Sequence, residues 1–316
     1  MNEPPRVGDL LWRNGALVPS DTAQVHVSAV GHASVAATFD GIHAYWNNSR
    51  EELLVFRLEE HIQRFLGSMQ LARLHTSWSS AELIQGTLAL LRASGASGDT
   101  YIRPWCFVAG DRHREQMVPP DAEVEVVIAL WSFESKLPST RTATAAIPSW
   151  TRISPNTMPP RIKAFANYHN GRFGNIEALE RGADWPIFLD AAAHVTESSG
   201  AAVAVVKNGR VEVPHNGDGL LESVTRATVA TLLTEECSVE VRERDLGRTD
   251  VYMADEIIFL GTSAEVTPIV RVDGRSIGDG RVGPMARLIA DKYHSCVRGL
   301  DGTRPEWRTA VWNAES

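Results

Sequence analysis

The chain has 316 residues, 43% of them hydrophobic and 22% charged, a composition typical of a globular protein with room for two domains. Its formal net charge of −8 and its pI near 5.7 argue against a basic nucleic-acid-binding surface. No stretch reaches the roughly 18 apolar residues of a membrane helix, and the polar, proline-bearing start is not typical of a signal peptide. The widely spaced Cys106, Cys237 and Cys296 fit reduced thiols in a cytoplasmic protein and indicate no metal site.

The first elements are predicted from turn residues and from the spacing of apolar residues. Asn14-Gly15 between two apolar stretches predicts a hairpin over residues 9–18. Residues 36–45 form an extended run. Apolar residues then recur at threes and fours between positions 54 and 74, which predicts a helix, and a second helix is expected over 80–94.

Two strands are expected next, over 101–108 and 124–131. Side chains alternate across a strand, so Tyr101 and Arg103 share one face. An arginine can bind a carboxylate through two parallel hydrogen bonds. The pair is therefore a candidate carboxylate-binding site, although a half-exposed sheet face explains the same pattern.

A polar, proline-containing segment separates the two halves of the chain. We predict an N-terminal domain over 1–133, a linker over 134–142 and a C-terminal domain over 143–316. The second half is expected to contain a strand at 142–147, a proline-rich loop at 148–160, a helix at 167–181, strands at 185–189 and 194–197, and a hairpin over 203–213.

Lys163 is the most informative residue of the second half. Only four of the 31 basic residues are lysines, and Lys163 has the apolar neighbours Ile162, Ala164 and Phe165. Such a setting disfavours the ammonium, and a neutral lysine is a nucleophile that can form a Schiff base. Glu197 follows an apolar stretch downstream. A carboxylate beside a pyridine nitrogen keeps that nitrogen protonated, which is what pyridoxal-phosphate chemistry requires.

Two further segments are suited to holding an anion. Ser223, Val224 and Thr225 are expected at a helix N-terminus, where free N–H groups favour a phosphate. The Gly261-Thr262-Ser263 turn follows a buried strand and offers backbone N–H groups and hydroxyls. Helix capping in the first case, and an ordinary turn in the second, are the commoner meanings of these patterns.

The order of these motifs resembles the fold-type IV pyridoxal-phosphate enzymes, and within them the branched-chain amino acid aminotransferases of class IV. The likeness extends over nearly the whole chain. Its most specific pieces are Tyr101-Ile-Arg-Pro, Ser149-Trp-x-Arg-x-Ser-Pro-Asn-Thr-Met-Pro, Lys163 with Asn167-Tyr168, and Gly261-Thr-Ser-Ala-Glu-Val-Thr-Pro.

This resemblance implies a role for each matching residue. Lys163 would carry the cofactor and move the substrate proton, Glu197 would pair with the pyridine nitrogen, and Tyr168 would bond the phenolic oxygen. The remaining cofactor contacts fall on Arg64, Val224, Thr225 and Thr262 for the phosphate, and on Leu221 under the ring. The implied substrate contacts are Tyr101, Thr262 and Ser263 for the α-carboxylate, Arg103 for the second carboxylate of glutamate or 2-oxoglutarate, and Phe39 and Gly41 along the pocket.

Several positions depart from the family pattern. Ser34 replaces a pocket tyrosine, and His43 replaces the arginine that ends the Glu-Gly-Ile-Arg segment. Gly200-Ala-Ala replaces Gly-Glu-Asn, which removes a polar support. Glu222-Ser223 replaces Pro-Gly and brings an acid near a site meant for an anion. These changes leave the cofactor chemistry in place and suggest an altered substrate pocket, as in an accessory biosynthetic aminotransferase.

The sequence thus predicts a two-domain α/β enzyme of fold type IV, with a smaller N-terminal α/β domain and a larger C-terminal domain built on a β-barrel-like sheet. We expect a cytoplasmic homodimeric aminotransferase acting on small amino acids and 2-oxo acids, with no nucleic-acid or membrane partner. Three alternatives stay open: an (R)-selective amine transaminase, an aminodeoxychorismate-type lyase, and a catalytically silent relative. Arg103 counts against the amine substrate, and the retained Lys163 counts against the silent relative.

Overall fold

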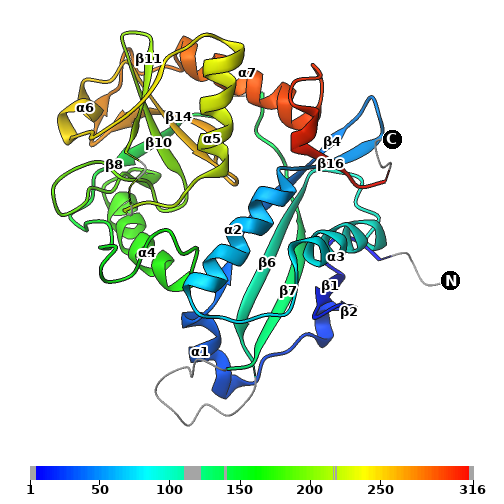
Figure 1. The fold of residues 1–316 in the computed structure, drawn as a ribbon. Helices are drawn as coiled ribbons and strands as arrows, with labels where there is room; N and C mark the ends of the chain where they lie inside the picture. The colour runs from blue at the N-terminus through cyan, green and yellow to red at the C-terminus, as the bar shows by residue number, and fades with distance from the viewer. Residues whose placement is uncertain (1–4, 110–121, 139–140, 216, 218, 313–316) are drawn as a thin grey trace. The chain divides into compact units, whose positions relative to one another are not determined.

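The computed structural model describes residues 5–109, 122–138, 141–215, 217 and 219–312 (Figure 1). They form a mixed α/β fold with two eight-stranded sheets. The chain divides into two compact units: unit 1 is Met1–Ser135, Ile162–Ala166 and Cys296–Ser316, and unit 2 is Lys136–Arg161 and Asn167–Ser295. Unit 1 therefore includes the Lys163 segment and the C-terminal residues, which the sequence-based division assigned to the C-terminal domain. No helix in the described ranges is long and apolar enough to cross a membrane.

The sheet of unit 1 is antiparallel, with the order β16-β5-β4-β6-β7-β1-β2 and β3 paired to β6. The predicted hairpin is confirmed, since Asn14 and Gly15 both adopt the positive φ that such a turn requires. The strands are β1 (Leu10–Arg13), β2 (Ala16–Pro19), β3 (Thr38–Phe39), β4 (Ile42–Asn47), β5 (Glu52–Phe56), β6 (Thr100–Val108), β7 (Val124–Ser132) and β16 (Arg308–Ala310).

Helices α2 (Leu58–Leu71) and α3 (Ser80–Ala93) lie alongside β6 and β7 (Figure 1). The apolar residues of these helices, among them Ile62 and Phe65, share one core with alternate residues of the strands, such as Ile102. Ser79 and Glu82 start α3 with a capping box. The predicted start of the first helix was wrong, because residues 52–56 form β5. That strand is buried at every position between β4 and β16, so it lacks the alternation by which a strand is recognised.

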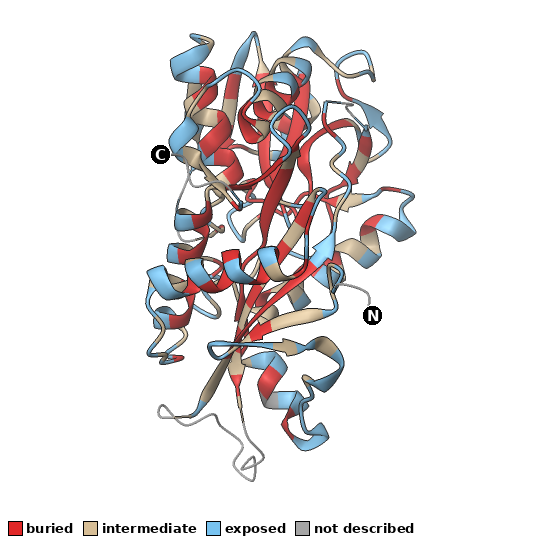
Figure 2. Ribbon diagram, turned by 90° about the vertical axis from the view of Figure 1, so that its right-hand side faces the viewer, coloured by how far each residue is buried: buried red, intermediate tan, exposed pale blue. Residues whose placement is uncertain are grey.

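The sheet of unit 2 mixes parallel and antiparallel pairs in the order β12-β11-β10-β13-β14-β8-β9, with β15 paired to β14. Its central strands are almost entirely buried (red in Figure 2). The strands are β8 (Ala143–Ala146), β9 (Trp185–Pro186), β10 (Ala202–Lys207), β11 (Arg210–Pro214), β12 (Val241–Arg244), β13 (Glu256–Gly261), β14 (Glu265–Val272) and β15 (Arg275–Ser276).

The remaining helices are α1 (Val30–Val35), α4 (Phe165–Glu180), α5 (Val224–Thr231), α6 (Arg248–Tyr252) and α7 (Pro284–Arg298). The π-helical turn Leu232–Glu236 extends α5, and 3₁₀ turns lie at Ser20–Thr22, Val27–Ala29 and Pro305–Trp307. The strand predicted over 194–197 was wrong: Val195, His194 and Glu197 form only isolated bridges, to three different segments. Backbone hydrogen bonds join the segment to residues 188–190, from the Phe188 N–H to the Glu197 carbonyl and from the Asp190 N–H to the His194 carbonyl, but this pairing is too short to make a named strand.

Candidate active site

Lys163 lies in a short segment that backbone hydrogen bonds fix within unit 1. The Phe39 N–H donates to the Lys163 carbonyl at 3.0 Å, and the Lys163 N–H donates to the Ser68 hydroxyl at 3.1 Å. Ala164 forms an antiparallel bridge with Thr38. The Lys163 Nζ lies 5.0 Å from the centroid of the Phe39 ring. The amine is therefore placed by a paired backbone and lies against an aromatic face.

Asp40, His61 and Arg64 form a second cluster in unit 1. The Arg64 Nε and Nη2 groups donate to the two Asp40 carboxylate oxygens at 2.8 and 2.7 Å. His61 Nδ1 lies 2.8 Å from Asp40 Oδ1, and the Asp40 side chain is completely buried. These bonds fix the plane of the guanidinium. They use two of its five N–H groups, so the predicted phosphate contact of Arg64 is compatible with this geometry.

Burial and charge act in opposite directions in this cluster. Burial alone would raise the pKa of Asp40, but the nearby Arg64 and His61 outweigh it and hold the pKa well below its usual range. Burial lowers the pKa of His61, and this outweighs the attraction of Asp40. His61 is thus neutral near pH 7, and its Nδ1–H donates to Asp40, because a carboxylate only accepts. The charge of Lys163 also lowers the pKa of His61, which places the amine near the cluster.

Tyr101 and Arg103 project from the same face of β6, as their alternation predicts. The Arg103 Nη2 group donates to the Tyr101 hydroxyl at 2.9 Å. Gly41 makes room for this tyrosine: a Cβ built there would lie 2.2 Å from the Tyr101 hydroxyl oxygen. Gly41, Tyr101 and Arg103, three of the predicted pocket residues, therefore come together in unit 1.

Aromatic rings surround the Arg103 guanidinium. Its Cζ lies 5.0 to 5.9 Å from four ring centroids, those of Tyr101, Phe39, Trp131 and Trp105. Cations are attracted to aromatic faces, more strongly where water is excluded. The Arg103 Cζ lies 5.3 Å and the Lys163 Nζ 5.0 Å from the centroid of the Phe39 ring, so both charged groups contact the same ring.

Two positions of unit 1 depart from the family pattern: His43, which is buried, and Ser34, which is exposed. His43 is buried, lies 3.9 Å from the Phe133 ring and 5.3 Å from the Tyr101 ring between centroids, and bonds the Tyr45 hydroxyl through Nδ1. It therefore packs against one of the predicted substrate residues. Ser34 is exposed on α1, and its hydroxyl donates to the Val30 carbonyl.

Glu197 is the central acid of unit 2. It is only 7% exposed, and its Oε1 accepts hydrogen bonds from Arg152 Nε at 2.9 Å and Arg152 Nη2 at 2.6 Å. Its Oε2 accepts a longer bond from the Leu221 N–H at 3.3 Å. A buried arginine next to a buried carboxylate favours the ionised form of that carboxylate.

Arg152 is a positioning residue that the sequence reasoning missed. Its Nη1 donates to the Asn170 Oδ1, which also accepts from the Ile153 N–H, while the Asn170 amide donates to the Thr151 carbonyl. These bonds hold the loop that carries Arg152 against α4. The signal was present as the arginine of the Ser149-Trp-x-Arg motif, but a single sequence does not show its distance to Glu197.

Helix α5 begins where it was predicted, with Ser223 as its N-cap. The Ser223 hydroxyl accepts from the Arg226 N–H at 3.1 Å. The Val224 and Thr225 N–H groups are the first two of the helix and have no acceptor within it. Thr225 is buried, and no described residue accepts a hydrogen bond from either of these N–H groups. Capping and anion binding are therefore compatible at this helix start.

Glu222, the acid expected to disturb this helix start, forms an ion pair with Arg161. Both side chains are substantially exposed, so the pair adds little to stability. Its importance is electrostatic, because the arginine offsets the negative charge next to the α5 N-terminus.

Thr262 and Ser263 form the turn between β13 and β14, also in unit 2. The turn packs closely on the chain after Glu197: a Cβ at Gly261 would lie 2.9 Å from the Gly200 carbonyl oxygen and 3.2 Å from the Ala201 Cα. Ala201 is buried, so the residues that replace the family's Glu-Asn pair fill an apolar contact. Tyr168 lies on the first turns of α4 and is partly exposed.

Residues 37–272 match the model of the family described as amino-transferase class IV. The chain belongs to the class IV aminotransferase family. It is 34% identical to a probable branched-chain-amino-acid aminotransferase of Aquifex aeolicus over 305 residues, which cover 96% of this chain and 97% of that protein.

Solved structures agree with this assignment. The branched-chain amino acid aminotransferase of Thermobaculum terrenum in its PLP form is 38% identical and superposes with a TM-score of 0.93, covering 99% of this chain and all of that one. The T.th. branched-chain amino acid aminotransferase complexed with N-(5'-phosphopyridoxyl)-L-glutamate is 31% identical, with a TM-score of 0.89 and coverage of 97% and 99%. The predicted fold type and enzyme class are confirmed.

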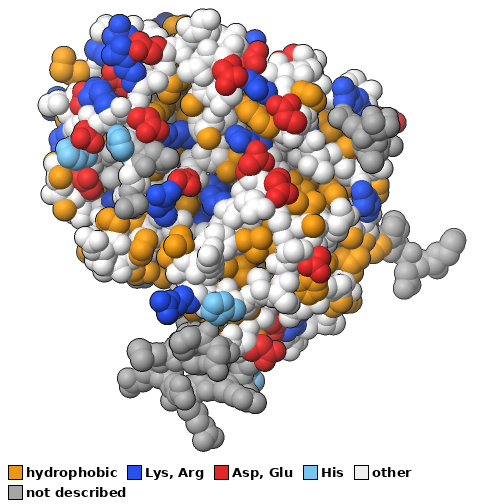
Figure 3. Space-filling model, viewed as in Figure 1, with side chains coloured by type: hydrophobic (Ala, Val, Ile, Leu, Met, Phe, Trp, Pro, Cys, Tyr) orange, Lys and Arg blue, Asp and Glu red, His pale blue; other side chains and the backbone are white. Residues whose placement is uncertain are grey.

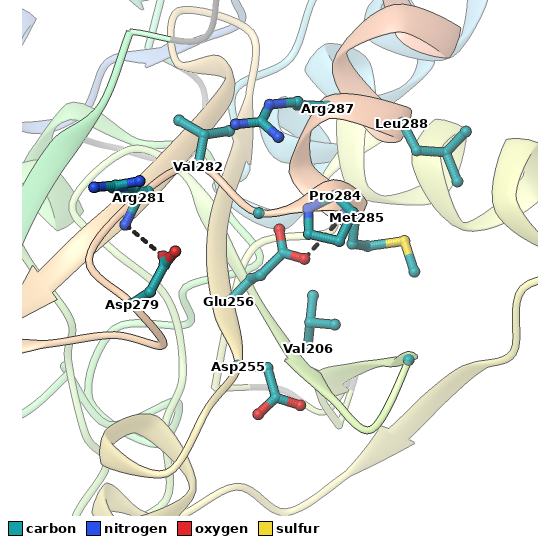
Figure 4. Close-up of a pocket in the computed structure, with 12 residues that line it drawn as sticks. Val206, Asp255, Glu256, Asp279, Arg281, Val282, Pro284, Met285, Arg287 and Leu288 are labelled. Atoms are coloured by element: carbon teal, nitrogen blue, oxygen red, sulfur yellow. Dashed lines mark hydrogen bonds between the residues drawn. The ribbon is translucent and has the colours of Figure 1, made fainter.

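A pocket of about 690 Å³ at the start of α7 contains none of the site residues predicted for this aminotransferase (Figure 4). The Glu256 carboxylate points to the first turn of the helix and accepts from the Met285 and Ala286 N–H groups at 2.9 and 2.8 Å. Acidic and basic side chains are interspersed on the face drawn in Figure 3. Glu256 therefore caps a helix, and the pocket has no evident part in the chemistry.

Proposed function

We propose that this class IV aminotransferase uses pyridoxal 5'-phosphate to move an amino group between an L-amino acid and a 2-oxo acid, with glutamate and 2-oxoglutarate as one substrate pair. The family supports the reaction class. Two solved relatives, one in a PLP form and one complexed with N-(5'-phosphopyridoxyl)-L-glutamate, support the cofactor and glutamate.

The residues present fit this cofactor. A buried carboxylate held by Arg152 suits a protonated pyridine nitrogen, and the two N–H groups at the start of α5 suit a phosphate. By the family resemblance, Lys163 would hold the cofactor covalently, and the further contacts would come from Arg64, Tyr168, Glu197, Leu221, Val224, Thr225 and Thr262. When bound, the cofactor supplies an electron sink for the bonds of the substrate α-carbon.

The protein side chains have separate tasks in this proposal. Lys163 would take the proton from the substrate α-carbon and pass it to a carbon of the cofactor. Its amine must therefore alternate between charged and neutral forms. The Phe39 ring and the paired backbone limit where its amine can move. Arg152 keeps Glu197 oriented through its two hydrogen bonds. Tyr101, Thr262 and Ser263 would receive the α-carboxylate of the substrate.

The proposal of a dicarboxylic substrate is based on Arg103, whose guanidinium would bind the second carboxylate. Its Nε is buried without a hydrogen-bond partner in the described part of the chain, and no described carboxylate pairs with its guanidinium. A buried donor without an acceptor is unfavourable unless a ligand supplies one, and a carboxylate is the ligand group that also neutralises the guanidinium charge. Because Arg103 and the Lys163 amine contact the same Phe39 ring, a substrate held at that amine would extend a second carboxylate toward Arg103.

The names of the relatives favour a branched-chain amino acid as the other substrate. We propose a pocket of this type that is altered at Ser34 and His43, and therefore a preference that is not limited to leucine, isoleucine and valine. A homodimer and a cytoplasmic location stay predictions.

Substitution of Arg103 by methionine tests the proposed use of glutamate. In the cofactor-loaded protein, kcat/KM for L-glutamate should fall by about tenfold to a hundredfold, since a hydrogen bond to a charged group contributes about 1.5–3 kcal/mol. The rate with L-leucine should change much less. Arg172→Met, at an exposed position on α4, is the matched control. Equal losses with both donors would contradict the role of Arg103.

A further inference from the structure

Trp105 lies two residues beyond Arg103 and faces the same side of β6. Residues 101, 103 and 105 are partly buried, whereas Ile102, Pro104 and Cys106 are buried in the opposite face. Trp105 stands opposite Phe39 on β3 in the strand register, and its ring makes an edge contact with Trp131 at 5.5 Å between centroids. It therefore belongs to the aromatic group around the Arg103 guanidinium.

The polar atom of Trp105 has no partner among the described residues. Its indole Nε1 is buried and makes no hydrogen bond to any of them, and the same is true of the Arg103 Nε. Buried indole N–H groups usually have an acceptor, and an unsatisfied buried donor is destabilising. Two such donors lie on one face of one strand, and the Arg103 guanidinium is 5.9 Å from the Trp105 ring, which indicates a place for an acceptor that comes from outside the chain.

The chemistry of that acceptor follows from the two donors. An apolar side chain would leave both N–H groups unsatisfied, and a site built to hydrogen-bond a group rejects analogues that lack it. A carboxylate can accept from both, and it also neutralises the guanidinium charge. Both donor atoms are buried, which strengthens both interactions.

We propose that Trp105 is a specificity-determining residue, whose indole N–H binds the distal carboxylate of a dicarboxylic amino acid or oxo acid together with Arg103. This inference rests on the proposed aminotransferase function and names the half of the reaction in which Trp105 acts. In the half-reaction with an apolar substrate, the indole contributes only its ring.

Trp105→Phe removes the N–H and keeps an aromatic ring. In the cofactor-loaded protein, we expect the Kd of glutarate, measured by calorimetry, to rise by about tenfold, the effect of one hydrogen bond to a charged group. The Kd of 4-methylpentanoate should change much less. KM for 2-oxoglutarate should rise in parallel, by a larger factor than KM for L-leucine. Trp312→Phe, at an exposed position, is the matched control.

A second readout is the indole ¹⁵N–¹H resonance of Trp105, assigned by its absence in Trp105→Phe. Glutarate should shift it downfield, and 4-methylpentanoate should not, a difference that a structural role would not produce. If the wild type binds glutarate and Trp105→Phe binds it equally well, the inference is wrong and the proposed function stands. If the wild type neither binds glutarate nor reacts with glutamate, the proposed glutamate specificity fails and the inference fails with it.

Discussion

Replacing Arg152 by methionine tests how the acid of unit 2 is held. Arg152 and Glu197 have side chains only 10% and 9% exposed, joined by two charge-assisted hydrogen bonds. Methionine preserves much of the volume and removes both bonds. Breaking a buried pair by removing one partner destabilises a protein by about 3–5 kcal/mol.

The assay is urea denaturation of the cofactor-free protein, compared with Arg242→Met. Arg242 pairs with Glu240 on the surface, where both side chains are about half exposed, so its replacement should lower the free energy of unfolding by less than about 1 kcal/mol. Adding Glu197→Gln to Arg152→Met should restore part of the loss, because the buried carboxylate is then replaced by a neutral amide. Equal losses for Arg152→Met and Arg242→Met would refute the assigned role.

Three further predictions follow from the remaining contacts. Lys163→Ala should abolish transamination while the far-ultraviolet circular dichroism spectrum is unchanged; retained turnover would exclude Lys163 as the catalytic amine. Because the folded pKa of His61 is lowered, the unfolded chain binds more protons below about pH 6.5, so stability falls as the pH decreases. When the pH is lowered from 8 to 5, the melting temperature should therefore fall less steeply for His61→Asn than for the wild type or for the exposed His75→Asn. Glu256→Ala leaves two N–H groups of α7 unsatisfied and should lower the free energy of unfolding by about 1–3 kcal/mol, measured by urea denaturation; no loss would show that water replaces the cap.

Local signals explain which parts of the fold were predictable. The Asn14-Gly15 turn and the alternation of Tyr101 and Arg103 are encoded within a few residues, and both predictions are confirmed. Strand β5 was assigned to a helix because it is buried on both faces, so no period of two marks it. The segment 194–197 has strand-like residues and bonds to residues 188–190, but that pairing is too short to make a strand, and a single sequence does not show how far a pairing extends.

The site was predictable as a set of residues and not as a set of contacts. The family resemblance named Lys163, Arg103 and Glu197. It did not indicate that Arg152 holds Glu197, since the two are 45 positions apart. The pairing of Arg64 with Asp40 likewise depends on the way β3 and α2 pack, which a single sequence does not contain.

The visible absorption spectrum of the protein with pyridoxal phosphate, before and after L-glutamate is added, tests the central claim most directly. We expect a band of bound cofactor that glutamate converts to the pyridoxamine form, and that Lys163→Ala lacks. A band that glutamate leaves unchanged while another amino acid converts it would contradict the glutamate specificity assigned to Arg103. If no band appears, the chain is not a pyridoxal-phosphate aminotransferase.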